Sequence, residues 1–157
     1  MRDYFLYPAQ TNLELYAQAI ERGYDETRLK QLSEAYRFAL RQVYPLVRGS
    51  EKPFIAHLVG TASLVLESAA PADWVLGALL HALYQRRVPF EGCLAPDARR
   101  PVVAARFGTA VDDLLFRYTA MEDSDPAGWL VAGKVIEPDV LTLRLADELE
   151  DLVGYAL

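Results

Sequence analysis

The chain has little of what marks a secreted or membrane protein. It holds a single cysteine, Cys93, among its 157 residues, so no disulfide framework can form, and we expect a reducing compartment and a cytoplasmic location. Its longest apolar stretch, Trp74–Tyr84, is far too short to span a bilayer. The first ten residues lack the apolar core of a signal peptide. We therefore expect no membrane partner.

Positive charge is scarce as well. The chain has 16 lysines and arginines against 22 aspartates and glutamates, which gives a net charge of -6. Because phosphate contacts dominate nucleic-acid affinity, a protein that binds nucleic acid through its surface needs a basic one, and we expect no such partner. A small anionic ligand is still allowed, since a local arginine or a metal ion can offset the net charge.

Patterns typical of β-strands are nearly absent, whereas helix signals recur. Thr11 and Glu14 have the spacing of a capping box, Asp25 is suited to cap a second helix, and Pro53 suits the first turn of a third. The segment Trp74–Tyr84, WVLGALLHALY, is apolar on nearly all sides, which is typical of a helix at the centre of a bundle. With 52% hydrophobic residues, the chain should fold as one all-α bundle of about seven helices.

Proline and glycine set the expected boundaries in the second half. The stretch Arg87–Arg100 contains two prolines and a glycine and predicts a long loop, followed by a short helix over Val102–Arg106. Thr109 is expected to cap the next helix. The last helix should begin near Pro138 and end at about Val153.

Three polar residues fall in segments that should be buried: His57, His81 and Asp147. A single histidine in an apolar helix is usually a hydrogen-bonded core residue. Asp147 is harder to explain, because it continues an apolar stripe and a buried carboxylate needs a cation, a metal ion or several donors. The three residues together therefore predict a polar site inside the bundle.

Four segments repeat motifs of a known enzyme family in the same order. They read RGSEKPFIAH from Arg48, LGALLHA from Leu76, AARFGTAVDDLL from Ala104 and LRLADELEDL from Leu143. The chain thus resembles the HD superfamily of metal-dependent phosphohydrolases, closest to the guanosine penta- and tetraphosphate hydrolase domains of the stringent response. The resemblance runs from Ala35 to Leu152. It implies a single HD-type domain over residues 1–157, with residues 25–153 as its core and residues 1–24 as an N-terminal helical extension.

The resemblance implies that His57, His81 and Asp147 bind one divalent metal ion, with manganese, iron and zinc all suited to such ligands. In that family an aspartate follows the central histidine and supplies a fourth ligand, but here the residue is Ala82. Three ligands and water can still hold an ion. The alternative is a hydrogen-bonded polar cluster without any cofactor.

Further departures concern catalysis and ligand contacts. The family's Glu-Asp pair, which handles water and metal, is replaced by Gln85 and Arg86, and neither can act as a general base. Arg48 matches the residue that contacts the nucleotide base, and Asp151 stands in place of an asparagine. Tyr84 follows His81 by three residues and could face the same cavity. We expect a ligand to bind at Arg48, Tyr84, Arg86 and Asp151.

Other charged residues are expected to be solvated. The carboxylates of Asp112, Asp113, Glu148 and Glu150 should lie on exposed helix faces. For the arginine pairs at residues 86–87 and 99–100, solvated loop charges are the simpler interpretation, and an anion-binding rim is the alternative.

Three functions stay open at this point. The first is a non-catalytic or catalytically impaired module that binds a phosphorylated small molecule or a protein partner, in which hydrolysis of guanosine tetraphosphate is absent or very slow. The second is an active metal-dependent phosphohydrolase with a reduced site. The third is an Fe(II)-dependent oxygenase of HD type, since two histidines and one carboxylate can hold iron for oxygen chemistry. A homodimer is compatible with all three.

Overall fold

The computed structural model describes residues 3–44, 46–48, 51–122 and 135–156, and this part of the chain is helical, with one isolated β-bridge between Val47 and Pro53. It contains seven α-helices and two short 3₁₀ helices. The α-helices are α1 (Asn12–Glu21), α2 (Glu26–Val43), α3 (Phe54–Glu67), α4 (Ala72–Leu80), α5 (Pro96–Phe107), α6 (Thr109–Glu122) and α8 (Pro138–Ala156). The 3₁₀ helices are η1 (His81–Tyr84) and η2 (Glu91–Cys93). The predicted all-α bundle of about seven helices is confirmed.

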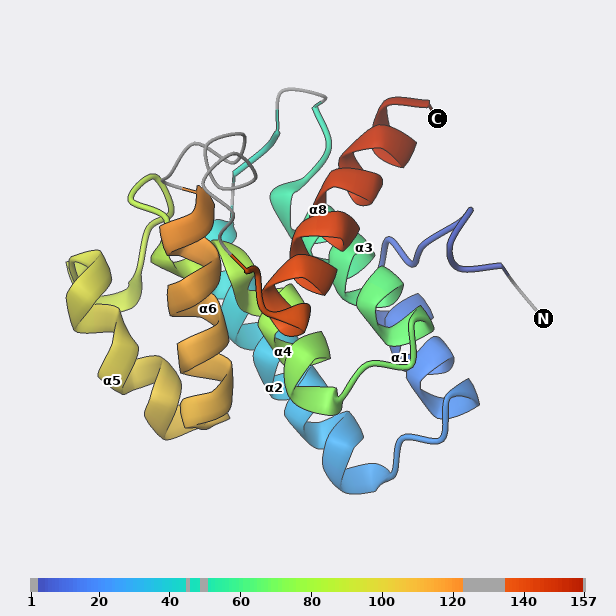
Figure 1. Ribbon diagram of the computed structural model, residues 1–157, viewed down its shortest axis with the longest axis horizontal. Helices are drawn as coiled ribbons and strands as arrows, with labels where there is room; N and C mark the ends of the chain where they lie inside the picture. Colours follow the sequence, from blue (N-terminus) through green and yellow to red (C-terminus); the bar gives the residue numbers. More distant parts are fainter. Residues whose placement is uncertain (1–2, 45, 49–50, 123–134, 157) are drawn as a thin grey trace.

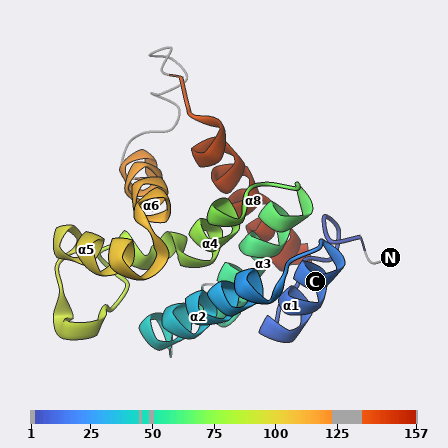
Figure 2. The ribbon, with the colours of Figure 1, turned by 90° about the horizontal axis from the view of Figure 1, so that it is seen from below.

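Helix α4 lies at the centre of the bundle (Figure 1). It packs against α2, α3, α6 and α8, and every residue from Val75 to its end at Leu80 is buried. Helices α5 and α6 form a pair on one side of α4, while α1 and α3 lie on the other (Figure 2). Helix α8 crosses α3, α4 and α6. The end of α4 is thereby enclosed by α3, α6 and α8.

The ends of the first helices form as their capping residues predict. The Glu14 amide donates to Thr11 Oγ1 at 3.3 Å and the Glu14 carboxylate accepts from the Thr11 amide at 3.2 Å, which completes the capping box of α1. The Asp25 side chain accepts from the Arg28 amide at 2.9 Å and caps α2. Pro53 precedes the first residue of α3. These local contacts depend on few residues, so the sequence is enough to predict them.

Two predicted boundaries are wrong. The apolar segment Trp74–Tyr84 is not one α-helix, because the α-helical conformation ends at Leu80 and η1 follows. The long loop expected up to residue 100 ends earlier, since Pro96 takes the first position of α5, where its missing N–H is not needed. Within the described residues, no helix is both long and apolar enough to cross a bilayer.

Candidate metal centre

The structure brings His57, His81 and Asp147 together from three elements. His57 lies on α3, His81 begins η1 at the end of α4, and Asp147 lies on α8. All three are buried, with relative exposures of 0%, 1% and 8%. Asp147 Oδ1 is 2.9 Å from His57 Nε2 and 3.5 Å from His81 Nε2. These three atoms therefore form one compact group at the junction of the helices.

Hydrogen bonds fix how each imidazole is protonated. His81 Nδ1 is 2.7 Å from the Ala78 carbonyl oxygen, which can only accept, so Nδ1 carries a proton. His57 Nδ1 is 2.6 Å from Glu150 Oε2, a carboxylate oxygen, and donates in the same way. In the neutral form of each ring the lone pair then resides on Nε2, the atom next to Asp147. This is the arrangement of metal-binding histidines whose second nitrogen is held by a carboxylate or carbonyl.

The pKa values of the two histidines shift in opposite directions. Burial lowers the pKa of His81 to about 4, so this ring is neutral at pH 7. Burial also opposes the charged form of His57, but its contacts with Asp147 and Glu150 outweigh burial and raise its pKa. His57 Nε2 is nevertheless without a well-formed hydrogen bond among the described residues, although Asp147 Oδ1 lies 2.9 Å away. A fully buried nitrogen in this situation is suited to bind a cation.

Asp147 is held as a carboxylate by its surroundings. The Tyr118 hydroxyl donates to Asp147 Oδ2, and the Tyr118 ring lies edge-on to His81 at 5.6 Å between centroids. Burial opposes the charge of Asp147, but the nearby imidazoles and the Tyr118 hydroxyl hold its pKa far below the usual range. Burial raises the pKa of Tyr118, which keeps this hydroxyl a donor at neutral pH. Asp147 is therefore a carboxylate at neutral pH, and its Oδ1 lies next to the two Nε2 atoms.

Glu150 belongs to the site, although it was expected on a solvated face. It is 1% exposed and pairs with Lys52 as well as with His57. Gly60 on α3 makes room for it, because a Cβ at this position would lie 2.5 Å from Glu150 Oε1. Glu150 follows Asp147 by three residues and so shares its helix face. That spacing is the signal that could have identified it.

Arg48 and Asp151 lie beside the cluster. Arg48 donates to Asp151 Oδ2 at 2.6 Å, and Asp151 Oδ1 is 3.4 Å from His57 Nδ1. The guanidinium of Arg48 also covers the Phe54 ring, at 5.6 Å from the ring centroid. Both charges are partly exposed, so they mark the edge of the cluster that a ligand can reach.

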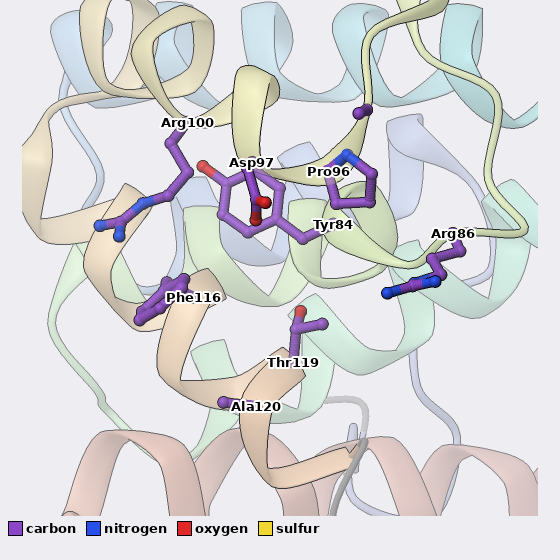
Figure 3. Close-up of a pocket in the computed structure, with 9 residues that line it drawn as sticks. Tyr84, Arg86, Pro96, Asp97, Arg100, Phe116, Thr119 and Ala120 are labelled. Atoms are coloured by element: carbon purple, nitrogen blue, oxygen red, sulfur yellow. The ribbon is translucent and has the colours of Figure 1, made fainter.

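Tyr84 and Arg86 lie elsewhere. The Tyr84 hydroxyl donates to Asp112 Oδ1 at 2.6 Å, and both Tyr84 and Arg86 line a separate cavity between η1, α5 and α6 (Figure 3). The Tyr84 hydroxyl is directed to Asp112 on α6 and not to the cluster. The expectation that Tyr84 shares a cavity with His81 is wrong.

The neighbouring charges correct two further expectations. Asp112 is buried and pairs with Arg100 through two hydrogen bonds of 3.0 and 2.8 Å, so it is not on a solvated face. Arg99 is buried as well and donates to the carbonyl oxygens of Leu83, at 2.6 Å, and Gln85, at 3.1 Å. Arg99 and Arg100 therefore hold η1 and α6 in place and are not solvated loop charges.

Glu122, the last residue of α6, is a carboxylate that no motif identified. It accepts from Gln85 Nε2 at 2.9 Å, and Arg144 Nη1 lies 3.9 Å from both Glu122 Oε1 and Asp147 Oδ2. Burial raises the pKa of Glu122. Gln85 thus holds a glutamate near the cluster.

The donor atoms of the cluster fit a divalent ion. Bonds of about 2.0–2.2 Å at tetrahedral or octahedral angles place neighbouring ligand atoms roughly 3.0–3.5 Å apart. The distances of 2.9 and 3.5 Å from Asp147 Oδ1 to the two Nε2 atoms agree with this spacing. Two imidazoles and one carboxylate suit zinc, iron and manganese. Ala82 is fully buried and offers no ligand atom.

A second group of ligand atoms is less well suited. His57, Glu150 and Asp151 also place one donor atom each within 4.8 Å of the others. In that group the histidine would bind through Nδ1, which already donates to Glu150. The two carboxylates are also neutralised by Lys52 and Arg48. The group around Asp147 is therefore the better candidate.

No family model matches the chain, and no curated protein matches it.

Proposed function

We propose that the chain is an HD-type helical protein that binds one divalent metal ion through His57, His81 and Asp147. With this ion it binds a small phosphorylated ligand and hydrolyses it slowly or not at all. The observation that carries the proposal is the convergence of two buried Nε2 atoms on one carboxylate oxygen, while both Nδ1 atoms are already engaged.

The surroundings of the cluster favour an anionic ligand. Arg48 and Lys52 come from the segment before α3, and each pairs with a carboxylate of α8 next to the candidate ligands. When bound, a divalent ion supplies a positive centre for a phosphate oxygen. Arg48 is partly exposed and can turn its guanidinium from Asp151 to a phosphate or a planar base.

Weak hydrolysis follows from the residues after His81. Ala82 removes a ligand, and Gln85 donates its amide to Glu122 instead of activating water. The guanidinium of Arg86 offers no lone pair to accept a proton from water. Loss of a general base alone slows such reactions by about 10²- to 10⁴-fold.

Metal titration of metal-free protein by isothermal calorimetry tests the proposal. We expect one equivalent of Mn²⁺ or Zn²⁺ to bind to the wild type and to Asp139→Asn, a control on the first turn of α8 whose carboxylate pairs with Arg117. Asp147→Asn removes the charge of the shared ligand and should lower the metal affinity by more than about 100-fold. This is a larger loss than replacing a residue that only hydrogen-bonds a metal ligand causes. The proposal fails if the wild type binds no metal, or if Asp147→Asn binds as the wild type does.

An active phosphohydrolase is the second candidate, and Glu122 is the observation that favours it. A partly buried carboxylate with a raised pKa is suited to take a proton from water. In that case manganese-dependent release of pyrophosphate from guanosine tetraphosphate should be measurable and should vanish in Glu122→Gln, while metal affinity is kept. Metal binding without such release supports the impaired module, and selective retention of Fe(II) with oxygen consumption would favour the oxygenase.

A further inference from the structure

A cavity of about 410 Å³ lies between the end of η1, the first turn of α5 and the second half of α6 (Figure 3). None of the three candidate metal ligands lines it. Its size falls in the range of sites for small molecules, roughly 300–1,000 Å³. The cavity is separate from the candidate metal centre, so the residues of its own walls indicate what it binds.

The walls are largely aromatic and apolar. Phe116 is 44% exposed, and Figure 3 shows its ring at one side of the cavity, with Pro96 and the Tyr84 ring at the other. The Arg100 guanidinium covers one part of Phe116, at 4.1 Å from the ring centroid. A half-exposed phenylalanine in a concave site is a surface on which a flat or branched apolar group can pack.

Two opposite charges in the cavity have no partner. Arg86, two residues after η1, and Asp97 on the first turn of α5 are exposed and form no ion pair or hydrogen bond with another residue in the described ranges. In Figure 3 the guanidinium and the carboxylate both extend over the cavity from separate elements. Arg100 differs, because Asp112 neutralises it through two hydrogen bonds. One cation and one anion are thus left to face a ligand.

Thr119 adds an unsatisfied hydroxyl. Its Oγ1 is buried and has no hydrogen-bond partner among the described residues, and Figure 3 shows it directed into the cavity. Threonines in helices commonly donate to the carbonyl one turn earlier, but this one does not. It can therefore donate to or accept from a ligand between the two charges.

We propose that this cavity binds a zwitterionic small molecule, of the type of an α-amino acid with an aromatic or large apolar side chain. The carboxylate would bind Arg86, the ammonium would bind Asp97 and Thr119, and the side chain would pack on Phe116. A simple anion leaves Asp97 unpaired and repelled, and a simple cation does the same to Arg86. Only a ligand with both charges satisfies both residues.

The test uses three matched probes in calorimetric or NMR titrations of the whole chain. L-Phenylalanine carries both charges, phenylacetate lacks the ammonium, and phenethylamine lacks the carboxylate. We expect saturable binding of phenylalanine, and at least about tenfold weaker binding of each truncated probe, because each loses one charge-assisted hydrogen-bonded contact. Absence of saturable phenylalanine binding, or equal binding of all three probes, would overturn the proposal.

Charge-removing variants provide the second arm of the test. Arg86→Gln should weaken phenylalanine binding about tenfold without weakening phenethylamine, and Asp97→Asn should weaken phenylalanine without weakening phenylacetate. Arg87→Gln is the control, since Arg87 is exposed, next in sequence, and does not line the cavity. The proposal also fails if Arg87→Gln weakens phenylalanine binding as much as Arg86→Gln does.

Discussion

Replacing Gly60 by alanine should disturb the candidate metal centre through Glu150 alone. A Cβ at position 60 would lie 2.5 Å from Glu150 Oε1, 2.6 Å from its Cγ and 2.8 Å from its Cδ. Contacts this short force the Glu150 side chain to move, and His57 Nδ1 then loses the acceptor that now lies 2.6 Å away. The substitution changes no group that itself contacts a metal or a ligand.

The expected magnitude follows from two opposing effects. Overpacking of a filled core costs about 1–3 kcal/mol. The better helix propensity of alanine offsets up to about 1 kcal/mol of this within α3. Gly60→Ala should therefore lower the free energy of unfolding by about 1–2 kcal/mol. In a Glu150→Ala background the space is vacant, and the same change should stabilise the protein by about 0.5–1 kcal/mol.

Urea denaturation of the four proteins of this cycle measures the coupling between the two positions. The coupling should be about 2 kcal/mol, with unchanged denaturant slopes. Glu148→Ala is the matched control background, because Glu148 lies on the same helix and is 53% exposed at its side chain. The reasoning is refuted if Gly60→Ala has the same effect in the Glu150→Ala and Glu148→Ala backgrounds. Gly60→Ala should also weaken metal binding about 10- to 100-fold, as loss of a residue that orients a ligand does.

Three further predictions concern other parts of the chain. The hydrogen bonds from Arg117 lower the pKa of Asp139, so this pair stabilises the fold fully above the unfolded pKa of about 3.9 and less as pH falls through the folded value. Between pH 6 and pH 3, the free energy of unfolding measured by chemical denaturation should fall more for the wild type than for Asp139→Asn. Ala82→Asp places a second carboxylate in a fully buried position, and melting curves should show a lower Tm without Mn²⁺ and a larger gain with it than for wild type. Tyr84→Phe removes the donor to Asp112 and should lower the free energy of unfolding by about 1 kcal/mol in chemical denaturation, whereas an unchanged value would show that this hydrogen bond adds no net stability.

The sequence was sufficient where structure depends on a few neighbouring residues. The caps at Thr11 and Asp25 fix the starts of α1 and α2 through contacts within four residues. The convergence of His57, His81 and Asp147 was also foreseeable, because the order of four motifs carries information that no single residue has. Each of these features leaves a signal in the sequence itself.

Features that depend on packing between helices left no such signal. The apolar pattern continues through His81, yet the chain changes there to a 3₁₀ turn, where Arg99 from α5 holds the following carbonyl groups. Glutamates such as Glu150 and Glu122 usually lie on solvated helix faces. Only their partners on other elements, such as Lys52 and Gln85, hold them near the cluster. Such partners become visible only when the elements are placed in space.

X-ray absorption spectroscopy of the zinc-loaded protein tests the central claim most directly, because it identifies the atoms bound to the ion. We expect one zinc ion per chain with two imidazole nitrogens and at least one carboxylate oxygen at about 2.0–2.2 Å, and loss of one imidazole in His81→Ala. A chain that retains no stoichiometric zinc, or a zinc shell without imidazole, would contradict the claim.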